Sequence, residues 1–161
     1  MGIRKRRIQA NFLKIESEFK QMSVGFTELN ESPSAQTSSK RYIHQASATQ
    51  SISGYEWSSA FTADQIESNE VIEYLRNIGE TLATGSDAET EYLIVDMDKK
   101  GTAENSFVAR KFEVAIQIDE FGDEDGELTI SGSLLGKGDP VVGTATITNG
   151  VATFTANSVS A

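Results

Sequence analysis

Several short stretches of the chain alternate hydrophobic and polar positions, and this alternation predicts β-strands. The stretches RKFEVAIQID (110–119) and ELTISGSLL (127–135) show it most clearly, and Gly132 leaves a gap or bulge in the second. The pattern therefore predicts a mainly β protein. Shorter candidate strands are FLKI (12–15), FKQMSVGFTEL (19–29), YEWSSAF (55–61) and EYLIVDM (91–97).

The stretch TATITNGVATFTA (144–156) predicts a tight β-hairpin. Asn149 and Gly150 suit the two positive-φ positions of a type I′ turn, which joins neighbouring strands through two residues. Such a turn pairs Ile147 with Ala152 and places their side chains on the same face of the sheet. Turn chemistry and alternation thus agree on the register of this hairpin.

One stretch, SNEVIEYLRNIG (68–79), has the periodicity of a helix instead. Ser68 or Asn69 can cap its first turn, and Gly79 can take the left-handed position that follows a helix. A single helix with one apolar stripe should lie on a sheet. We expect one domain over residues 1–161, a β-sandwich or partly closed barrel with one flanking α-helix. The apolar stripe consists of Val71, Ile72, Leu75 and Ile78.

A long polar stretch interrupts this pattern at residues 31–56, ESPSAQTSSKRYIHQASATQSISGYE. It contains seven Ser, two Thr and three Gln, a composition typical of a solvated linker. Its few apolar side chains cannot offset the backbone entropy of ordering it. We therefore predict a long loop over residues 31–53 that serves assembly and is mobile in the free subunit.

Charge is spread unevenly along the chain. The net charge is −10, whereas residues 1–11 carry four cations and no acid, which leaves −14 for the remainder. An acidic body repels nucleic-acid phosphates, so the basic segment 1–11 is predicted to be a solvated arm.

The sequence has no Cys, no apolar run long enough to span a membrane and no apolar signal region, so a cytoplasmic product is expected.

No constellation in the sequence indicates catalysis, and we predict that the protein is not an enzyme. The one histidine, His44, has no apparent partner for general-base chemistry. DEFGDEDGE (119–127) fails the EF-hand spacing in both frames, and GSLLGKGD (132–139) lacks the spacing and hydroxyl residue of a phosphate loop. We predict no catalytic residue, no cofactor and no metal site.

In its order of elements the chain resembles the tail tube (major tail) proteins of tailed bacteriophages. Three stretches carry the resemblance, which extends over roughly residues 12–155: GFTELNESPSAQTSSKRYIHQASATQSISGYEWSSAFTADQ, SNEVIEYLRNIGE and VARKFEVAIQIDEFGDEDGELTISGSLLGKGDPVVGTATI. The resemblance implies a β-sandwich that forms hexameric rings, which stack into a tube. It implies an acidic channel through which DNA passes without specific binding when the genome is ejected, and no contact with a membrane. The implied location is the virion tail, assembled in the host cytoplasm.

The resemblance also implies partners and contact residues. The partners would be further copies of the chain, the tape measure protein, the tail terminator and the distal tail protein. The loop 31–53 would contact the neighbouring ring, the arm 1–11 would meet acidic surface on a neighbour, and the tail 157–161 would be frayed. The implied residues are Tyr42, Ile43, His44 and Ile52 in the loop, Arg4, Arg6 and Arg7 in the arm, and Glu113 and Gln117 facing the lumen.

Two alternatives remain open at this point. The first is a β-sandwich that binds carbohydrate or acts in adhesion, for which Tyr55, Trp57 and Phe61 could form an exposed aromatic row. The same spacing is more typical of a buried face. The second is a related tail component, a terminator or distal tail protein, whose rings do not propagate.

Overall fold

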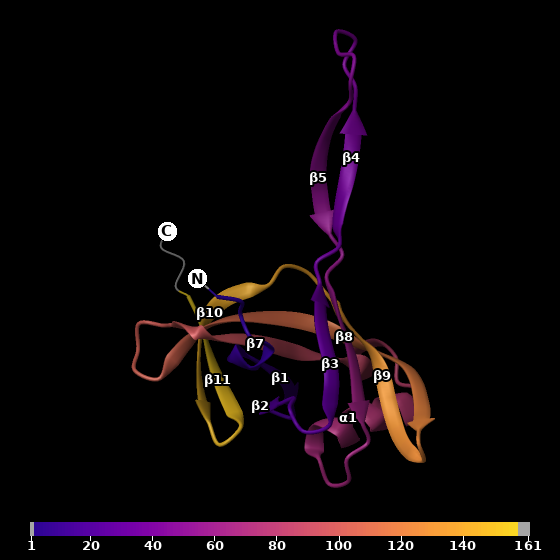
Figure 1. The fold of residues 1–161 in the computed structure, drawn as a ribbon, viewed down its shortest axis with the longest axis vertical. Helices are drawn as coiled ribbons and strands as arrows, with labels where there is room; N and C mark the ends of the chain where they lie inside the picture. Colours follow the sequence, from indigo (N-terminus) through magenta and orange to yellow (C-terminus); the bar gives the residue numbers. More distant parts are fainter. Residues whose placement is uncertain (1, 158–161) are drawn as a thin grey trace.

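The computed structural model describes residues 2–157 and is a β-structure with one α-helix and one long projection (Figure 1). The fold class predicted from the alternation is confirmed. The strands are β1 (Gln9–Ile15), β2 (Glu18–Gln21), β3 (Phe26–Ser32), β4 (Ala35–Lys40), β5 (Thr49–Tyr55), β6 (Ser58–Asp64), β7 (Glu89–Lys100), β8 (Ser106–Glu124), β9 (Glu127–Gly136), β10 (Val141–Thr148) and β11 (Val151–Ala156). The helix is α1 (Glu70–Glu80), and two short 3₁₀ turns are η1 (Arg6–Ile8) and η2 (Gly85–Ala88).

Nine of the strands form one antiparallel sheet in the order β10-β11-β2-β1-β7-β8-β9-β6-β3. Strand β10 also pairs with β8, so the sheet curls back on itself at one side. The other side extends from β8 through β9 and β6 to β3. Strand β8 is long enough to belong to both parts, because its first half pairs with β7 and its second half with β9.

The curled sheet encloses two apolar cores, and the central strands contribute to both. On β7, Tyr92 and Ile94 face the larger core, which lies under α1, β3, β6 and β9, whereas Leu93 and Val95 face the smaller one. The smaller core is closed by β2, β10 and β11 and contains Phe12. Both faces of β7 are buried over residues 92–96, and four consecutive apolar side chains, Tyr92 to Val95, occupy this part of the strand.

Helix α1 lies on the sheet with the predicted apolar stripe buried. The side chain of Asn69 caps its start by accepting the backbone N–H groups of Val71 and Ile72, both at 3.1 Å. The predicted role of Gly79 is wrong: the helix continues past it, and Leu82 takes the left-handed conformation (φ 54°). Gly79 is instead a close contact, because a Cβ there would lie 2.5 Å from the ring of Phe121.

The hairpin predicted at residues 144–156 is confirmed together with its register. Ile147 pairs with Ala152, and Asn149 and Gly150 have φ values of 51° and 77°. The irregularity expected at Gly132 lies on the partner strand: Ile118 pairs with Gly132 and Glu120 with Ser131, so the extra residue of the bulge is Asp119 on β8. Any Cβ at Gly132 would lie 2.0 Å from the backbone oxygen of Gln117.

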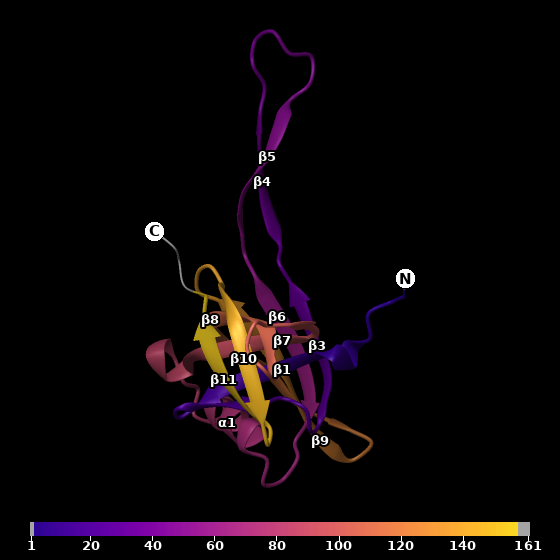
Figure 2. The ribbon, with the colours of Figure 1, turned by 90° about the vertical axis from the view of Figure 1, so that its left-hand side faces the viewer.

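The segment predicted as a loop at 31–53 is mostly strand. Residues 31 and 32 complete β3, and β4 and β5 then form a separate two-stranded sheet that projects away from the body (Figures 1 and 2). We call residues 33–55 the projecting hairpin. Its backbone groups pair with each other from Ala35 opposite Tyr55 to Lys40 opposite Thr49. The composition failed to indicate strands because the pairing depends on backbone groups rather than on apolar side chains.

Candidate assembly surfaces

The tip of the projecting hairpin lies far from the body (Figure 2). It carries exposed apolar and basic side chains. Ile43 is fully exposed and Tyr42 is half exposed. The tip is internally braced: the Tyr42 backbone N–H donates to the Gln45 side-chain oxygen (3.1 Å), and the Lys40 ammonium lies 5.2 Å from the Tyr42 ring centre. The ring of His44 stacks on that of Tyr42 at 6.2 Å.

The structure places the four residues predicted for inter-ring contact on this hairpin, but not all at one point. Tyr42, Ile43 and His44 share the tip, whereas Ile52 lies on β5 opposite Thr37 and is exposed. The strand β4, from Ala35 to Lys40, can span roughly 20 Å at ~3.3 Å per residue. The tip can therefore reach well beyond the body's own surface. Whether these side chains contact a neighbouring ring stays a prediction.

A polar and aromatic cluster fixes the root of the hairpin to the body. Arg110 on β8 donates two hydrogen bonds to the carboxylate of Glu31, at 2.8 and 3.2 Å. The indole N–H of Trp57 donates to the same carboxylate at 2.7 Å, and the indole stacks on Phe112 with ring centres 4.0 Å apart. Glu31 precedes the hairpin and Trp57 follows it, so this root cluster ties both ends of the hairpin to β8.

The root cluster was missed in the sequence because its members lie far apart along the chain. Glu31 and Arg110 are 79 positions apart, and neither residue belongs to a recognisable motif. The only available signal was Trp57, which was considered as part of an aromatic row with Tyr55 and Phe61. That row does not exist: Phe61 is buried, Trp57 is partly covered by its stacking, and Tyr55 is 66% exposed.

The basic arm is bound to its own body. Arg4 donates to the carboxylates of Asp96 and Asp98 on β7, with contacts of 3.1 Å. These bonds raise the pKa of Arg4, and the Arg4 hydrogen bond lowers the pKa of Asp98. Arg6 donates to the Asn11 side chain (2.6 Å), which in turn donates to the buried hydroxyl of Tyr92, and burial raises the pKa of that hydroxyl.

The three arginines predicted to meet a neighbour thus differ in what they do within one subunit. Arg4 and Arg6 have partners in their own chain, as described above. Arg7 is exposed and forms no ion pair within residues 2–157. Contact of the arm with acidic surface on a neighbour stays a prediction, and Arg7 is the member available for it.

Glu113 and Gln117 are exposed on one face of β8, as the alternation predicts. That face continues over β9 and β6 with small side chains, because Ser133 lies opposite Gln117 and Ala60 lies opposite Ser133. On β3 the neighbouring position is Asn30, opposite Ala60. The result is a flat polar surface whose other side covers the larger core. Whether it lines a channel stays a prediction.

This four-stranded part of the sheet has two edges at which backbone groups are open for pairing. Strand β3 is the last strand of the sheet, and no other strand within residues 2–157 pairs with its outer edge. Beyond Ala115, β8 pairs with β9 alone among the described strands, so residues 116–124 form the second edge. Such edges can pair with another chain.

The acidic segment 119–127 is the end of a hairpin. Asp125 and Gly126 have positive φ values of 51° and 86°, as a two-residue turn requires. Within residues 2–157, no group of three or more His, Cys, Asp or Glu side chains is arranged to hold a metal ion. None of the helices described is long and apolar enough to cross a membrane. The tail predicted to be frayed, 157–161, lies outside the described residues except for Asn157.

The fold is shared with proteins of phage-like particles. A chain from the virion of a native gene transfer agent particle superposes with a TM-score of 0.61 at 14% identity, covering 87% of this chain and 98% of that one. A chain from the tail of an empty gene transfer agent particle, with C6 symmetry, gives a TM-score of 0.58 at 14% identity, covering 86% of this chain and 97% of that one. No protein-family model and no curated protein matches the chain.

Proposed function

We propose that the protein is a structural, non-enzymatic component of a phage-type tail that forms hexameric rings, which stack into the tail tube. The observation that carries this proposal is the shared fold with a chain of a C6-symmetric tail, with nearly the whole of both chains superposed. The two open sheet edges support it independently, since each copy offers an edge on either side of the same four strands.

Strand direction makes these edges compatible in a ring. Each neighbouring pair in the series β3, β6, β9 and β8 is antiparallel, so β3 and β8 run in opposite directions. When a second copy is rotated about an axis along the strands, its β8 meets the first copy's β3 in an antiparallel pairing. The contact joins two different surfaces of the chain, and such a contact forms a ring when the rotation between neighbouring copies is a whole fraction of a turn, as in six-fold symmetry.

In this arrangement each part of the molecule has a role. The polar face with Glu113 and Gln117 lines the channel, through which DNA passes without specific binding. The projecting hairpin crosses to the next ring. The tape measure protein occupies the channel before ejection, and terminator and distal tail proteins close the ends. The protein resides in the virion tail and assembles in the host cytoplasm.

Negative-stain microscopy of the purified protein over a range of concentrations tests this function. We expect six-fold rings and, at high concentration, tubes of stacked rings. Rings that never stack would favour a terminator or distal tail protein. Protein that is monomeric at every concentration and salt condition would overturn the proposal. A monomer that binds glycans would favour a carbohydrate-binding module. The structure offers little support for such a module, because Tyr55, Trp57 and Phe61 do not form one exposed aromatic row.

A further inference from the structure

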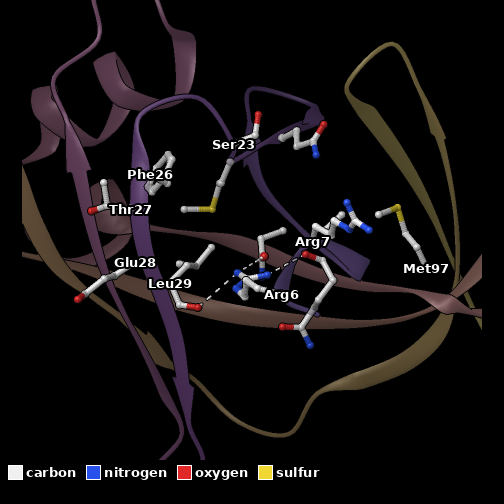
Figure 3. Close-up of a pocket in the computed structure, with 13 residues that line it drawn as sticks. Arg6, Arg7, Ser23, Phe26, Thr27, Glu28, Leu29 and Met97 are labelled. Atoms are coloured by element: carbon white, nitrogen blue, oxygen red, sulfur yellow. Dashed lines mark hydrogen bonds between the residues drawn. The ribbon is translucent and has the colours of Figure 1, made fainter. Parts of the chain in front are cut away.

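A groove of about 490 Å³ runs beside the open edge of β3, between that strand and the N-terminal arm (Figure 3). Its apolar lining comes from Ala10 on β1, Met22 after β2, Phe26 and Leu29 on β3, and Met97 on β7. Arg6 and Arg7 also line the groove. Figure 3 shows Arg6 between the arm and β3, where it donates to the Leu29 backbone oxygen at 3.3 Å.

A hydrophobic knob lies beside the opposite edge of the same sheet. Leu82 follows the last turn of α1 and is 83% exposed, in a left-handed conformation that is unfavourable for leucine. It borders a small hollow together with Ile116 and Ile118, two residues at the open part of β8. The backbone N–H groups of Leu82 and Ala83 close the end of α1 on the Gly79 and Ile78 oxygens, but the Leu82 side chain is not buried within the subunit.

We propose that Leu82 of one copy inserts into the groove beside β3 of the next copy when β8 of the first pairs with β3 of the second. This inference rests on the proposed ring assembly and names its side-chain contact. Ile118 and α1 lie on the face of the sheet that covers the larger core, and so does Leu29. Edge pairing would therefore bring the end of α1 beside the groove rather than to the channel face.

Charge on the two edges is complementary. Residues 116–124 of β8 carry four acids and no cation, and they are the residues that would run along β3. The groove contributes Arg6 and Arg7 against one acid, Glu28, so its lining is net cationic. Arg7 has no ion-pair partner within residues 2–157. An incoming backbone N–H can replace Arg6 at the Leu29 oxygen, while Arg6 keeps its hydrogen bonds to Gln9 and Asn11 and its positive charge stays beside the acidic strand.

The other candidate occupant from a second copy is the tip of the projecting hairpin, with its exposed Ile43. Charge disfavours it, because residues 33–55 contain two cations, Lys40 and Arg41, and no acid. Placing these cations beside Arg6 and Arg7 would be repulsive. The acidic strand that flanks Leu82 has the charge that the groove requires.

Cross-linking provides the first test, since the chain has no Cys and only the introduced thiols can react. A variant with both Leu82→Cys and Met97→Cys is treated with a short bismaleimide under ring-forming conditions. We expect a covalent ladder of dimer to hexamer on a denaturing gel. The matched control carries Ile43→Cys with Met97→Cys and should give no ladder within isolated rings. A ladder from the control alone would assign the groove to the hairpin tip and overturn the proposal.

Complementation provides the second test and does not depend on the cross-linker. Leu82→Asp removes the knob but leaves the groove, and Met97→Asp does the reverse. Each variant alone should be a folded monomer by circular dichroism and size-exclusion chromatography, with at least a tenfold loss of ring formation. Their mixture should give dimers and no rings, because only one productive contact is possible. Rings from Leu82→Asp alone would overturn the proposal.

These outcomes separate the inference from the function on which it rests. If the unmodified chain forms rings and the Leu82→Asp variant does so equally well, the ring proposal stands and the knob contact is wrong. If the unmodified chain forms no rings under any condition, the function itself fails before either variant is interpreted.

Discussion

The projecting hairpin and the body are built from the same chain by different means. In the body, strands and helix enclose two apolar cores, and side chains such as Phe12, Leu93 and Leu134 are fully buried. Between residues 35 and 55, none of the described side chains is buried, and the two strands are held by backbone pairing and by polar contacts such as Ser38 to Ser51 at 3.0 Å. The body is stabilised by packing. The hairpin leaves its side chains available for contacts with other molecules.

The largest expected effect comes from removing the hairpin. Residues 35–55 can be replaced by two glycines, because the backbone N–H of Glu56 already donates to the Ser34 oxygen at 3.0 Å and the two ends are adjacent. We expect the free energy of unfolding to change by no more than about 1 kcal/mol, since no core contact is lost. Tubes should disappear from electron micrographs, while rings persist.

The matched control for this deletion keeps the hairpin and changes only its polar strands, for example Ser39→Thr on β4. That variant should form tubes as the unmodified chain does. Stacked tubes from the deletion variant would mean that ring-to-ring contact lies elsewhere and that the hairpin has another role.

The second prediction concerns the body. Phe112→Ala removes a buried ring that stacks on Trp57, and should lower the free energy of unfolding by about 3–5 kcal/mol in chemical denaturation. Ile43→Ala at the hairpin tip removes a side chain that is also apolar but fully exposed. This variant should change the free energy of unfolding by less than about 0.5 kcal/mol. Equal effects at the two sites would mean that the tip is packed in the free subunit.

Strands, turns and the helix could be predicted from the sequence where local side-chain patterns alone determine them. Alternation located the strands around Val114 and Ile130, and turn chemistry fixed the register at Asn149 and Gly150, because both signals are local. The apolar stripe of α1 was located for the same reason. Gly79 was misjudged because its role is a close contact with Phe121, a residue 42 positions away. A left-handed glycine and a closely packed glycine look alike in sequence.

The hairpin was misjudged for a thermodynamic reason. The sequence argument set the entropy cost of ordering residues 31–56 against the burial of a few apolar side chains, Tyr42, Ile43, Ile52 and Tyr55. It left out the hydrogen bonds that the segment's own backbone groups form with each other. Those side chains prove to be exposed, so burial contributes even less than assumed. The sheet edges and the groove beside β3 were beyond prediction, because they depend on which strands become neighbours.

The third prediction addresses the boundary between the two regions. Glu31→Gln weakens the bonds from Arg110 and from the Trp57 indole, and should lower the free energy of unfolding by about 1–2 kcal/mol. Trp57 is the only tryptophan, so its emission reports directly on the root cluster and should shift to longer wavelength. Glu80→Gln, which breaks an exposed pair with Arg76 on α1, is the control and should leave both the free energy of unfolding and the emission spectrum nearly unchanged.

The smallest expected effect follows from a substitution in the arm, residues 1–11. The arm is exposed like the hairpin, but ion pairs bind it to the body. The hydrogen bond from Arg4 holds the pKa of Asp98 below its usual value. A pKa that is lower in the folded state stabilises the fold above the unfolded value of ~3.9, and this stabilisation is lost as pH falls through the folded pKa. Arg4→Gln should raise the pKa of Asp98, measured by NMR titration of its carboxyl carbon.

Arg76→Gln is the matched control for the arm, because it removes an arginine whose partner is Glu80 rather than Asp98. The pKa of Asp98 should then stay where it is in the unmodified chain. If Arg4→Gln also leaves it unchanged, the arm does not rest on β7 in solution. Arg4 would then be available, together with Arg7, for acidic surface on a neighbouring copy. The arm would in that case belong with the hairpin, as a part of the chain whose side chains serve assembly rather than the fold of the subunit.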